Sequence, residues 1–353
     1  MNKLCRMPYL IFLLSLNFSC VEKKATKKEI NKSEIVRASK SDTLKFTSGI
    51  RAIFQDSKGN YWFGSHNEGV SYYDGKIFQY FNNTNGLLDN QIRSIEEDKN
   101  GTIWLGTAKG VNSYEGKKFT TYTTQTNNPT LEWNNTSGDL WFNAGEKDGL
   151  NRFDGKKMNY LIFPKPKNTN LDNSFGVTDL SKDKNGNLWI STYAALFSYD
   201  GKMTTIFDHE KLKLKTNENL HIRSVLADSK GRIWIGNNGI GVLLMEHDKT
   251  IHFSEVNGLI QKNSSKNGNR SPTGTMEHVF AIEEDSGGNI WFGDRDTGAW
   301  KYDGKNVINY SINTKLSTPM IWSIYKDNSN NLLFGMAEGG VYKFNGKSFD
   351  KAF

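Results

Sequence analysis

One short stretch of this chain has the residue types of a calcium loop. It reads DKNGNLW, from Asp183 to Trp189, and places Asn, Gly and Asn after an acidic residue. Carboxylate and amide oxygens are the ligands that Ca²⁺ prefers, and a Gly allows a loop to turn sharply around the ion. A single copy would therefore suggest a metal site.

The stretch is not single, because the pattern D-x-x-G-x-x-W recurs along the chain. Two copies depart from it: NTSGDLW begins at Asn135, and DNSNNLL begins at Asp327. The Trp or its replacement stands at positions 62, 104, 141, 189, 234, 291 and 333. Seven metal sites would need further ligands that the unit lacks. We therefore interpret the acid as a turn residue that accepts backbone hydrogen bonds, with Gly supplying the turn conformation, and expect no metal.

A second set of residues could bind a ligand. Each lies five positions before the turn acid of its unit, on what we expect to be an inner strand. The set is Arg51, Arg93, Thr130, Thr178, Arg223, Phe280 and Trp322. Arg suits carboxylate or sulfate, and aromatic faces suit sugar rings, so the set predicts a site for an anionic glycan or a similar ligand. In the alternative interpretation, the arginines pair with turn acids and the aromatic rings fill contacts between units.

A third set consists of imidazoles and acids on predicted loops. They are His66, Glu68, Glu146, Asp148, Asp294, Asp296 and His278. Their spacing matches no known ligand set, and the chain contains none of the common catalytic motifs. We therefore assign no catalytic residue and no cofactor, and keep His278 as a candidate ligand contact.

Short strands must position these residues. In each unit an apolar strand precedes the D-x-x-G turn, a second strand carries the Trp, and a third strand such as GVSYYDG ends in a tight turn before a fourth. The turn is usually Asp-Gly, Glu-Gly or Asn-Gly, the preferred signal for a two-residue hairpin. Four antiparallel strands in about 45 residues form the blade of a β-propeller, and seven units predict a seven-bladed ring over residues 46–353. Two smaller barrels are the alternative.

The same strand order assigns the turns to faces of the ring. The short D-x-x-G and Asp-Gly turns fall on one face, and the variable loops fall on the other. The longest connection spans residues 257–278, and we expect it to cover the ligand-binding face partly. The Trp and the aromatic residue of the third strand are expected to pack between neighbouring blades.

The repeat resembles the two-component regulator propeller repeat, in seven copies across most of the chain. That resemblance implies a seven-bladed propeller and ligand sensing, and it implies no catalytic residues. In the best-known members the propellers precede an immunoglobulin-like domain, a membrane span and a kinase. None of these follows in this sequence, so direct signalling by this chain is not expected.

The N-terminal residues predict export. Residues 1–19 have a basic start and an apolar run, and the following Cys20 resembles the acylated cysteine of bacterial lipoproteins. The other cysteine is Cys5, so the mature chain would have no disulfide. Residues 1–40 contain nine basic and three acidic side chains, against 36 and 35 in the rest, so no nucleic-acid surface is indicated. We interpret residues 20–45 as a disordered basic tether.

Together these features predict an exported lipoprotein of the periplasm, outer membrane or cell surface. It would bind a small molecule, a glycan or an envelope protein partner, and would touch the membrane only through its lipid. Two alternatives remain: a propeller lyase or hydrolase with a His and acid site, and a structural partner of an outer-membrane complex.

Overall fold

The protein is an all-β, seven-bladed propeller. The computed structural model describes residues 38–353 except 117, 124–132, 134–135, 137, 146, 165–174, 217, 248, 262–269 and 313–317. Almost all regular structure in this part is strand. No helix among the described residues is long and apolar enough to cross a bilayer.

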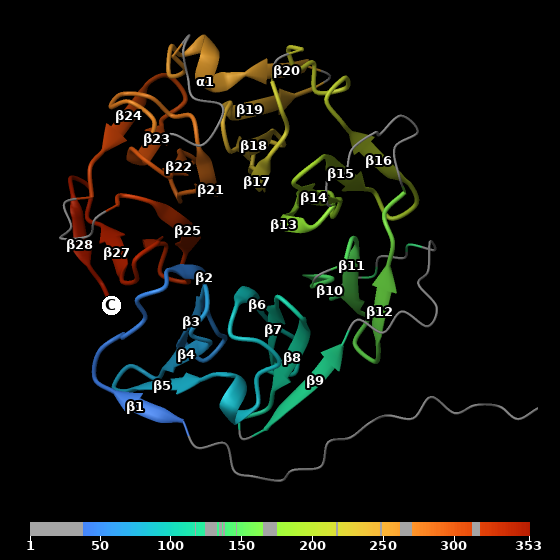
Figure 1. The fold of residues 1–353 in the computed structure, drawn as a ribbon, viewed down its shortest axis with the longest axis vertical. Helices are drawn as coiled ribbons and strands as arrows, with labels where there is room; N and C mark the ends of the chain where they lie inside the picture. Colours follow the sequence, from blue (N-terminus) through green and yellow to red (C-terminus); the bar gives the residue numbers. More distant parts are fainter. Residues whose placement is uncertain are drawn as a thin grey trace, which may run out of the picture. The chain divides into compact units, whose positions relative to one another are not determined.

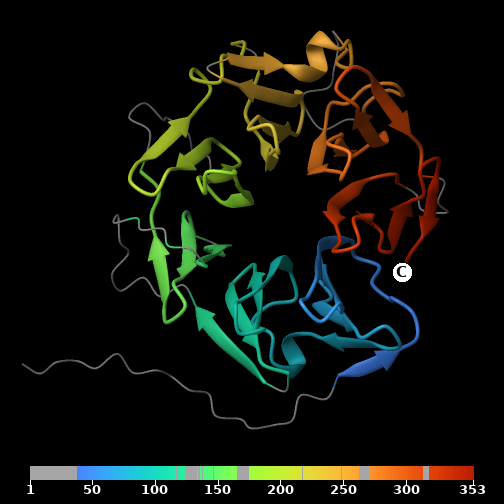
Figure 2. The same cartoon turned by 180° about the vertical axis from the view of Figure 1, so that it is seen from behind.

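The strands form seven antiparallel sheets around one axis (Figures 1 and 2). Blades one and two contain β2 (Ile50–Gln55), β3 (Tyr61–Ser65), β4 (Val70–Tyr73) and β5 (Phe78–Phe81), then β6 (Ile92–Glu97), β7 (Ile103–Thr107), β8 (Gly110–Tyr114) and β9 (Phe119–Thr123). Blades three and four contain β10 (Leu140–Asn143), β11 (Leu150–Phe153) and β12 (Met158–Leu161), then β13 (Val177–Lys182), β14 (Leu188–Thr192), β15 (Leu196–Tyr199) and β16 (Thr204–Phe207).

The remaining blades follow in chain order. Blade five contains β17 (Ile222–Ala227), β18 (Ile233–Asn237), β19 (Gly241–Glu246) and β20 (Lys249–His252). Blades six and seven contain β21 (Val279–Glu284), β22 (Ile290–Asp294), β23 (Gly298–Tyr302) and β24 (Val307–Tyr310), then β25 (Ile321–Lys326), β26 (Leu332–Met336), β27 (Val341–Phe344) and β28 (Phe349–Lys351). Among the described residues, two short helices, η1 (Asn83–Asn85) and α1 (Phe253–Val256), belong to the connections from one blade to the next along the chain.

Each blade uses its strands in sequence order, from the inside of the ring outward (Figure 1). This confirms the predicted strand order. The expected inner strand of blade three, with Thr130, falls outside the described residues. Blade one has an additional outer strand, β1 (Ser39–Ser41), paired with β5. The described structure therefore begins before the boundary expected at residue 46, and Leu44 is buried in the core of this blade.

The D-x-x-G turns are structural, as predicted. In blade four, the Asp183 carboxylate accepts the backbone N–H groups of Asn185 and Asn187, both at 2.9 Å. Gly186 has a φ of 84°, in the left-handed region that Gly adopts at no steric cost. The carboxylate also accepts the indole N–H of Trp189 at 3.4 Å, a contact that repeats in four other blades. The acid thus joins the turn to the tryptophan of the same blade.

A β-bulge interrupts the inner strand of each blade whose inner strand is described. On β2, Ile50 pairs with Ser65 and Ala52 pairs with Gly64, so Arg51 has no residue opposite it. The same register shift occurs at Arg93, Thr178, Arg223, Phe280 and Trp322. A bulge turns its extra side chain away from the regular alternation of the strand. The aligned set of the sequence is therefore the set of bulged residues.

A Gly on the second strand makes room behind the bulge in most blades. A Cβ on Gly335 would lie 2.4 Å from the Ser323 hydroxyl and 2.7 Å from the carbonyl oxygen of Ile50 in the next blade. Gly64, Gly106, Gly236 and Gly293 meet equally close neighbours. The Gly that follows the Trp in the repeat is therefore needed for neighbouring blades to approach each other.

The ring closes where blade seven meets blade one, without exchange of a strand. Inner strands β25 and β2 contact each other directly. The Ser323 hydroxyl donates a hydrogen bond to the carbonyl oxygen of Ile50 at 2.8 Å, and the Tyr61 hydroxyl donates one to Asp327 at 2.8 Å. Side chains, backbone groups and apolar packing of the two blades therefore hold this closure.

Candidate functional site

The inner strands surround a cavity of about 870 Å³, called here the central cavity. Its volume lies in the range of small-molecule sites. The bulged residues Arg51, Arg93, Thr178, Arg223, Phe280 and Trp322 all line it. The structure thus brings together every described member of the set that the sequence aligned.

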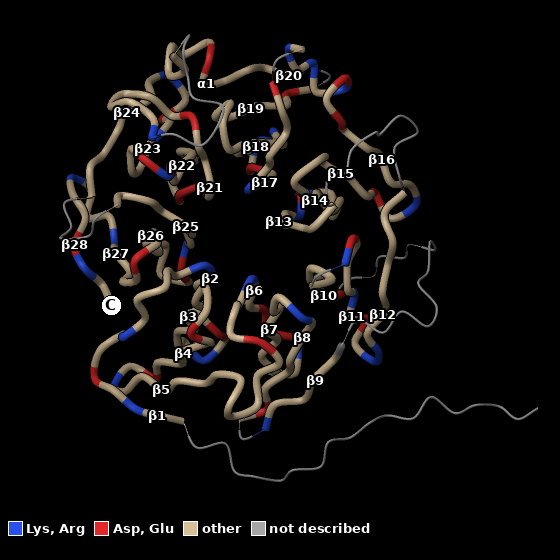
Figure 3. Tube along the Cα trace, in the orientation of Figure 1, with Lys and Arg blue, Asp and Glu red and all other residues tan. Residues whose placement is uncertain are grey.

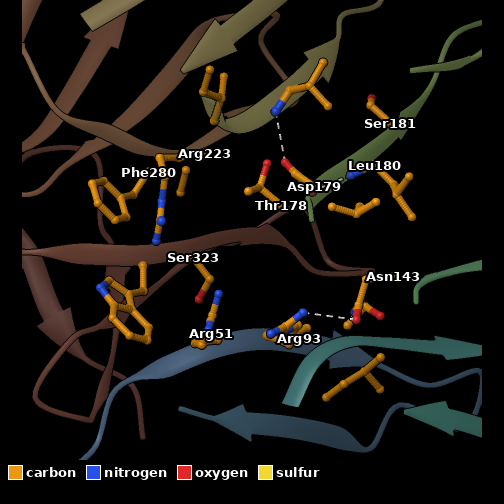
Figure 4. A pocket seen from close by; sticks show the side chains of 18 of the residues that line it. Arg51, Arg93, Asn143, Thr178, Asp179, Leu180, Ser181, Arg223, Phe280 and Ser323 are labelled. Atoms are coloured by element: carbon orange, nitrogen blue, oxygen red, sulfur yellow. Dashed lines mark hydrogen bonds between the residues drawn. The ribbon is translucent and has the colours of Figure 1, made fainter. Parts of the chain in front are cut away.

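Three of these residues, Arg51, Arg93 and Arg223, form what we call the arginine tier. Figure 4 shows their side chains pointing into the same space from three inner strands, and Figure 3 shows basic positions on those strands. The three positive charges of the tier repel one another. Burial, together with the charges of Arg93 and Arg223, lowers the pKa of the Arg51 guanidinium to about 10. An arriving anion would relieve this repulsion.

Two of the arginines pack against aromatic rings. The guanidinium carbon of Arg51 lies 5.0 Å from the ring centre of Trp322, and that of Arg223 lies 4.3 Å from the ring centre of Phe280. Tyr193, which the sequence did not single out, contacts Arg223 through its hydroxyl at 3.5 Å. Cation–π contacts of this kind orient a guanidinium without neutralising it.

The sequence analysis left open that turn acids neutralise the arginines. The structure does not show this for Arg51 or Arg223. Among the described residues, neither of the two forms an ion pair with a carboxylate. The turn acid of blade five, Asp228, instead binds Arg232 at 2.6 Å and the Trp234 indole at 2.9 Å. Arg93 differs, because it donates hydrogen bonds to Asn143 at 3.3 Å and to the carbonyl oxygen of Gly145 at 3.1 Å.

An imidazole lies beside the arginine tier. The Nδ1 atom of His66 is 3.2 Å from the amide nitrogen of Gln91 and 3.5 Å from Arg51. Its ring packs edge-on against Trp322 at 4.6 Å. Burial lowers the pKa of His66, and the three arginines lower it further. The imidazole is therefore neutral at pH 7 and adds no positive charge to the tier.

A second group of cavity residues is acidic. Glu96, Asp179 and Glu283 also line the central cavity, and we call them the carboxyl tier. Glu96 and Glu283 stand three positions after the bulge on their strands, or about 10 Å further along the axis. Burial raises the pKa of both glutamates to about 7 and that of Asp179 to about 6. The sequence signal for the two glutamates is an acid on an inner strand, two positions before the turn acid, where Phe54 and Leu226 stand in other blades.

His278 does not belong to the central cavity. It is buried between blades five and six, where its Nδ1 atom lies 2.7 Å from the Asn238 side-chain oxygen. Its backbone N–H donates to Asp294 at 2.9 Å. Burial lowers the pKa of His278 to about 4, so its ring is neutral. The sequence placed this residue on a loop of the ligand-binding face; the structure places it in the packing between two blades.

The loop acids named with His278 mostly serve the loops themselves. Glu68 accepts the backbone N–H groups of Thr47 and Ser48 at 2.9 and 2.6 Å, and Asp296 binds Arg295 at 2.7 Å. Asp148 lines the central cavity. Glu146 and Cys20 lie outside the described residues, so lipid attachment stays a prediction. No described residue of the 257–278 connection lines the cavity, and residues 262–269 are not described.

One group of described residues has the spacing of metal ligands, away from the cavity. Glu218, His252 and Glu255 each offer a ligand atom within 4.8 Å of the others. Lys215 already occupies this place, since its ammonium group forms ion pairs with Glu255 and Glu218. The cluster is therefore satisfied by a side chain of the protein.

A known family model matches four of the seven repeat units. The sequence model described as "Two component regulator propeller" matches residues 45–67, 86–109, 170–194 and 217–239. These stretches contain the first strands of blades one, two, four and five with their bulges and turns. Four units of the chain thus match the repeat of this family in sequence.

Solved structures share the fold. The extracellular domain of a B. thetaiotaomicron protein, described as a hybrid two component system, matches with a TM-score of 0.62 and 22% identity. That match covers 86% of this chain and 40% of the other. Virginiamycin B lyase from Staphylococcus aureus matches with a TM-score of 0.60 and 14% identity, covering 87% of this chain and 98% of the lyase. No curated protein matches the sequence.

These similarities show the propeller fold. The chain spans less than half of the length of the hybrid two component structure that it matches. The function of this chain must therefore be inferred from its own central cavity.

Proposed function

We propose that the chain is an exported ligand-binding propeller of the sensor type, and that its central cavity binds an anionic glycan or a similar ligand. One observation carries the proposal: Arg51 and Arg223 face the cavity with no ion pair among the described residues, beside the aromatic faces of Trp322 and Phe280. A carboxylate or sulfate would supply the missing countercharge bidentately.

The carboxyl tier supports a sugar-like ligand in particular. An anionic group held by the arginine tier would place the rest of the ligand within reach of Glu96 and Glu283. Because their pKa is raised to about 7, these groups are partly protonated at neutral pH, and they can both donate to and accept from hydroxyl groups. The similarity to an extracellular domain of a hybrid two component system is consistent with ligand sensing.

The test is binding of oligosaccharides that carry uronic acid or sulfate, with neutral oligosaccharides of the same backbone, measured by titration calorimetry. We expect anionic ligands to bind, and the double substitution Arg51→Gln and Arg223→Gln to lower their affinity by at least about 30-fold, or about 2 kcal/mol. Lys76→Gln, on an exposed turn, is the matched control for loss of charge. Unchanged affinity of the double variant for every bound glycan would contradict the proposal.

The same experiment addresses the two alternatives. A lyase or hydrolase would release products during the titration; in that case the imidazole to substitute is His66, which lines the cavity, rather than the buried His278. A purely structural partner would bind no oligosaccharide at all, and its interactions would not depend on the arginine tier.

A further inference from the structure

The interfaces between neighbouring blades, called seams here, follow a rule. In five seams the tryptophan of one blade packs, tilted or edge-on, against a Tyr or Phe from the third strand of the next blade. The pairs are Trp62 with Tyr114 at 5.5 Å, Trp104 with Phe153 at 4.1 Å, Trp141 with Tyr199 at 6.5 Å, Trp234 with Tyr302 at 5.8 Å and Trp291 with Phe344 at 4.7 Å. Each of these five seams therefore contains two aromatic residues, as the sequence predicted.

The seam between blades seven and one lacks the tryptophan but is filled from elsewhere. Leu333 stands in its place. The ring of Phe353 packs there, 5.6 Å from Tyr73 and 4.9 Å from Phe63. An aromatic ring that comes from outside the regular pattern thus completes this seam.

The seam between blades four and five lacks the other partner. Met245 pairs with Ile233 in the register where Tyr199 pairs with Leu188, so Met occupies the aromatic position of blade five. The turn that follows is also altered, since His247 has a φ of 55° where other blades have Gly. Trp189 is consequently only half-buried, whereas Trp234 is 0% exposed in the next seam.

A cavity of about 750 Å³ opens at this place, which we call the seam pocket. Its apolar lining consists of Trp189, Phe207 and Met245, and Phe207 lies 5.6 Å from Trp189. Around these, the lining contains Asp208, Glu210, Lys211, Lys213, His247, Lys249 and Thr250. Among the described residues its three lysines form no ion pair, and Lys211 lies 4.6 Å from the centre of the Phe207 ring.

We propose that the seam pocket is a second binding site, which takes a planar aromatic ring bearing a negatively charged group. The ring would lie against Trp189 beside Met245, where five other seams have a Tyr or Phe. The negative group would meet the lysines at the rim, which outnumber the two rim acids. This site shares no residue with the central cavity, so the proposal is independent of the function proposed above.

The test uses phenylacetate as the probe and cyclohexylacetate, of equal charge but without an aromatic ring, as its control. Binding to the full chain is followed by saturation-transfer NMR and titration. We expect phenylacetate to bind at least tenfold more tightly than cyclohexylacetate. Met245→Phe, which restores the regular seam, should abolish phenylacetate binding and raise Tm by a few degrees, because the added ring fills the cavity.

Two further variants make the result decisive. Met203→Phe, at a side chain that is 63% exposed on a turn of blade four, should change neither binding nor Tm. The Arg51→Gln and Arg223→Gln double variant should retain phenylacetate binding, which separates this site from the central cavity. If Met245→Phe fails to fold, Trp189→Leu replaces it and should lower the affinity at least tenfold. Equal affinity for both probes, or phenylacetate binding that survives filling of the pocket, would overturn the proposal.

Discussion

At the scale of single residues, the turn acid has more than one task. Asp285 accepts the backbone N–H groups of Gly287 and Asn289 through one oxygen, both at 2.9 Å. Its other oxygen accepts the indole N–H of the buried Trp291 at 2.9 Å. Burial alone would raise the pKa of Asp285, but the hydrogen bonds from Trp291 and Asn289 outweigh it and lower the pKa. The carboxylate is therefore needed in its charged form.

Replacing this acid should destabilise the fold. Asp285→Ala leaves a buried indole N–H and a turn without their acceptor, so we expect the free energy of unfolding to fall by about 2–4 kcal/mol. Urea denaturation measures the change. Asp303→Ala, on an exposed hairpin turn, removes two backbone hydrogen bonds and one from the Asn306 side chain, all at the surface, and should cost clearly less than Asp285→Ala. Equal losses at the two positions would show that the indole bond contributes nothing.

At the scale of elements, the inner hairpin of each blade is built from two coupled features. The bulge directs one side chain into the central cavity, and the Gly paired with the residue after the bulge allows the next blade to approach. Gly335 shows the coupling most clearly, because backbone and side chain of two different strands lie within 3 Å of the place where a Cβ would be. Interiors packed at this density transmit a small change in volume to their neighbours.

One methyl group should therefore disturb the closing seam. Gly335→Ala forces its Cβ against the carbonyl oxygen of Ile50, and we expect a loss of about 1–3 kcal/mol in the free energy of unfolding. Thermal unfolding by circular dichroism measures it. Gly75→Asn is the control, since that position is open and Asn tolerates the positive φ that Gly75 adopts. A variant Gly335→Ala as stable as the natural protein would refute the close approach.

At the scale of the whole molecule, the ring gathers acids that are far apart in the sequence. Glu96 comes from blade two and Glu283 from blade six, yet both line the same cavity. Burial is the largest cause of their raised pKa. A carboxyl whose pKa is higher in the folded than in the unfolded state takes up protons on folding, so its contribution to stability falls as pH rises.

This arrangement predicts the sign of a pH effect. Between pH 4.5 and about 7 the folded protein holds more protons on Glu96 and Glu283 than the unfolded chain does, so both groups disfavour folding increasingly across that window. Glu96→Gln with Glu283→Gln should stabilise the protein at pH 8 by about 1–3 kcal/mol and have almost no effect at pH 4. Denaturation at the two pH values checks this. A gain that is larger at pH 4 would contradict it.

The sequence predicts the fold well because a repeat aligns its own parts. Asp183 alone suggests a calcium loop, and only the other copies identify it as a turn residue. The arginine tier was predictable for the same reason, since five positions before an acid is a defined place on a strand. The carboxyl tier was not, because an acid such as Glu96 on a half-polar strand gives no sign of its burial. His278 shows the converse, since burial between two blades cannot be deduced from a position near a unit boundary.

The bulge on the inner strands has a consequence for how such a site can diversify. A bulged residue has no partner across the strand, and the six described bulges carry Arg, Thr, Phe or Trp on the same backbone. The identity of each side chain is thus uncoupled from the hydrogen bonds of its sheet. Ligand preference can therefore change by substitution at one bulge at a time, while the blades and their hydrogen bonds stay the same.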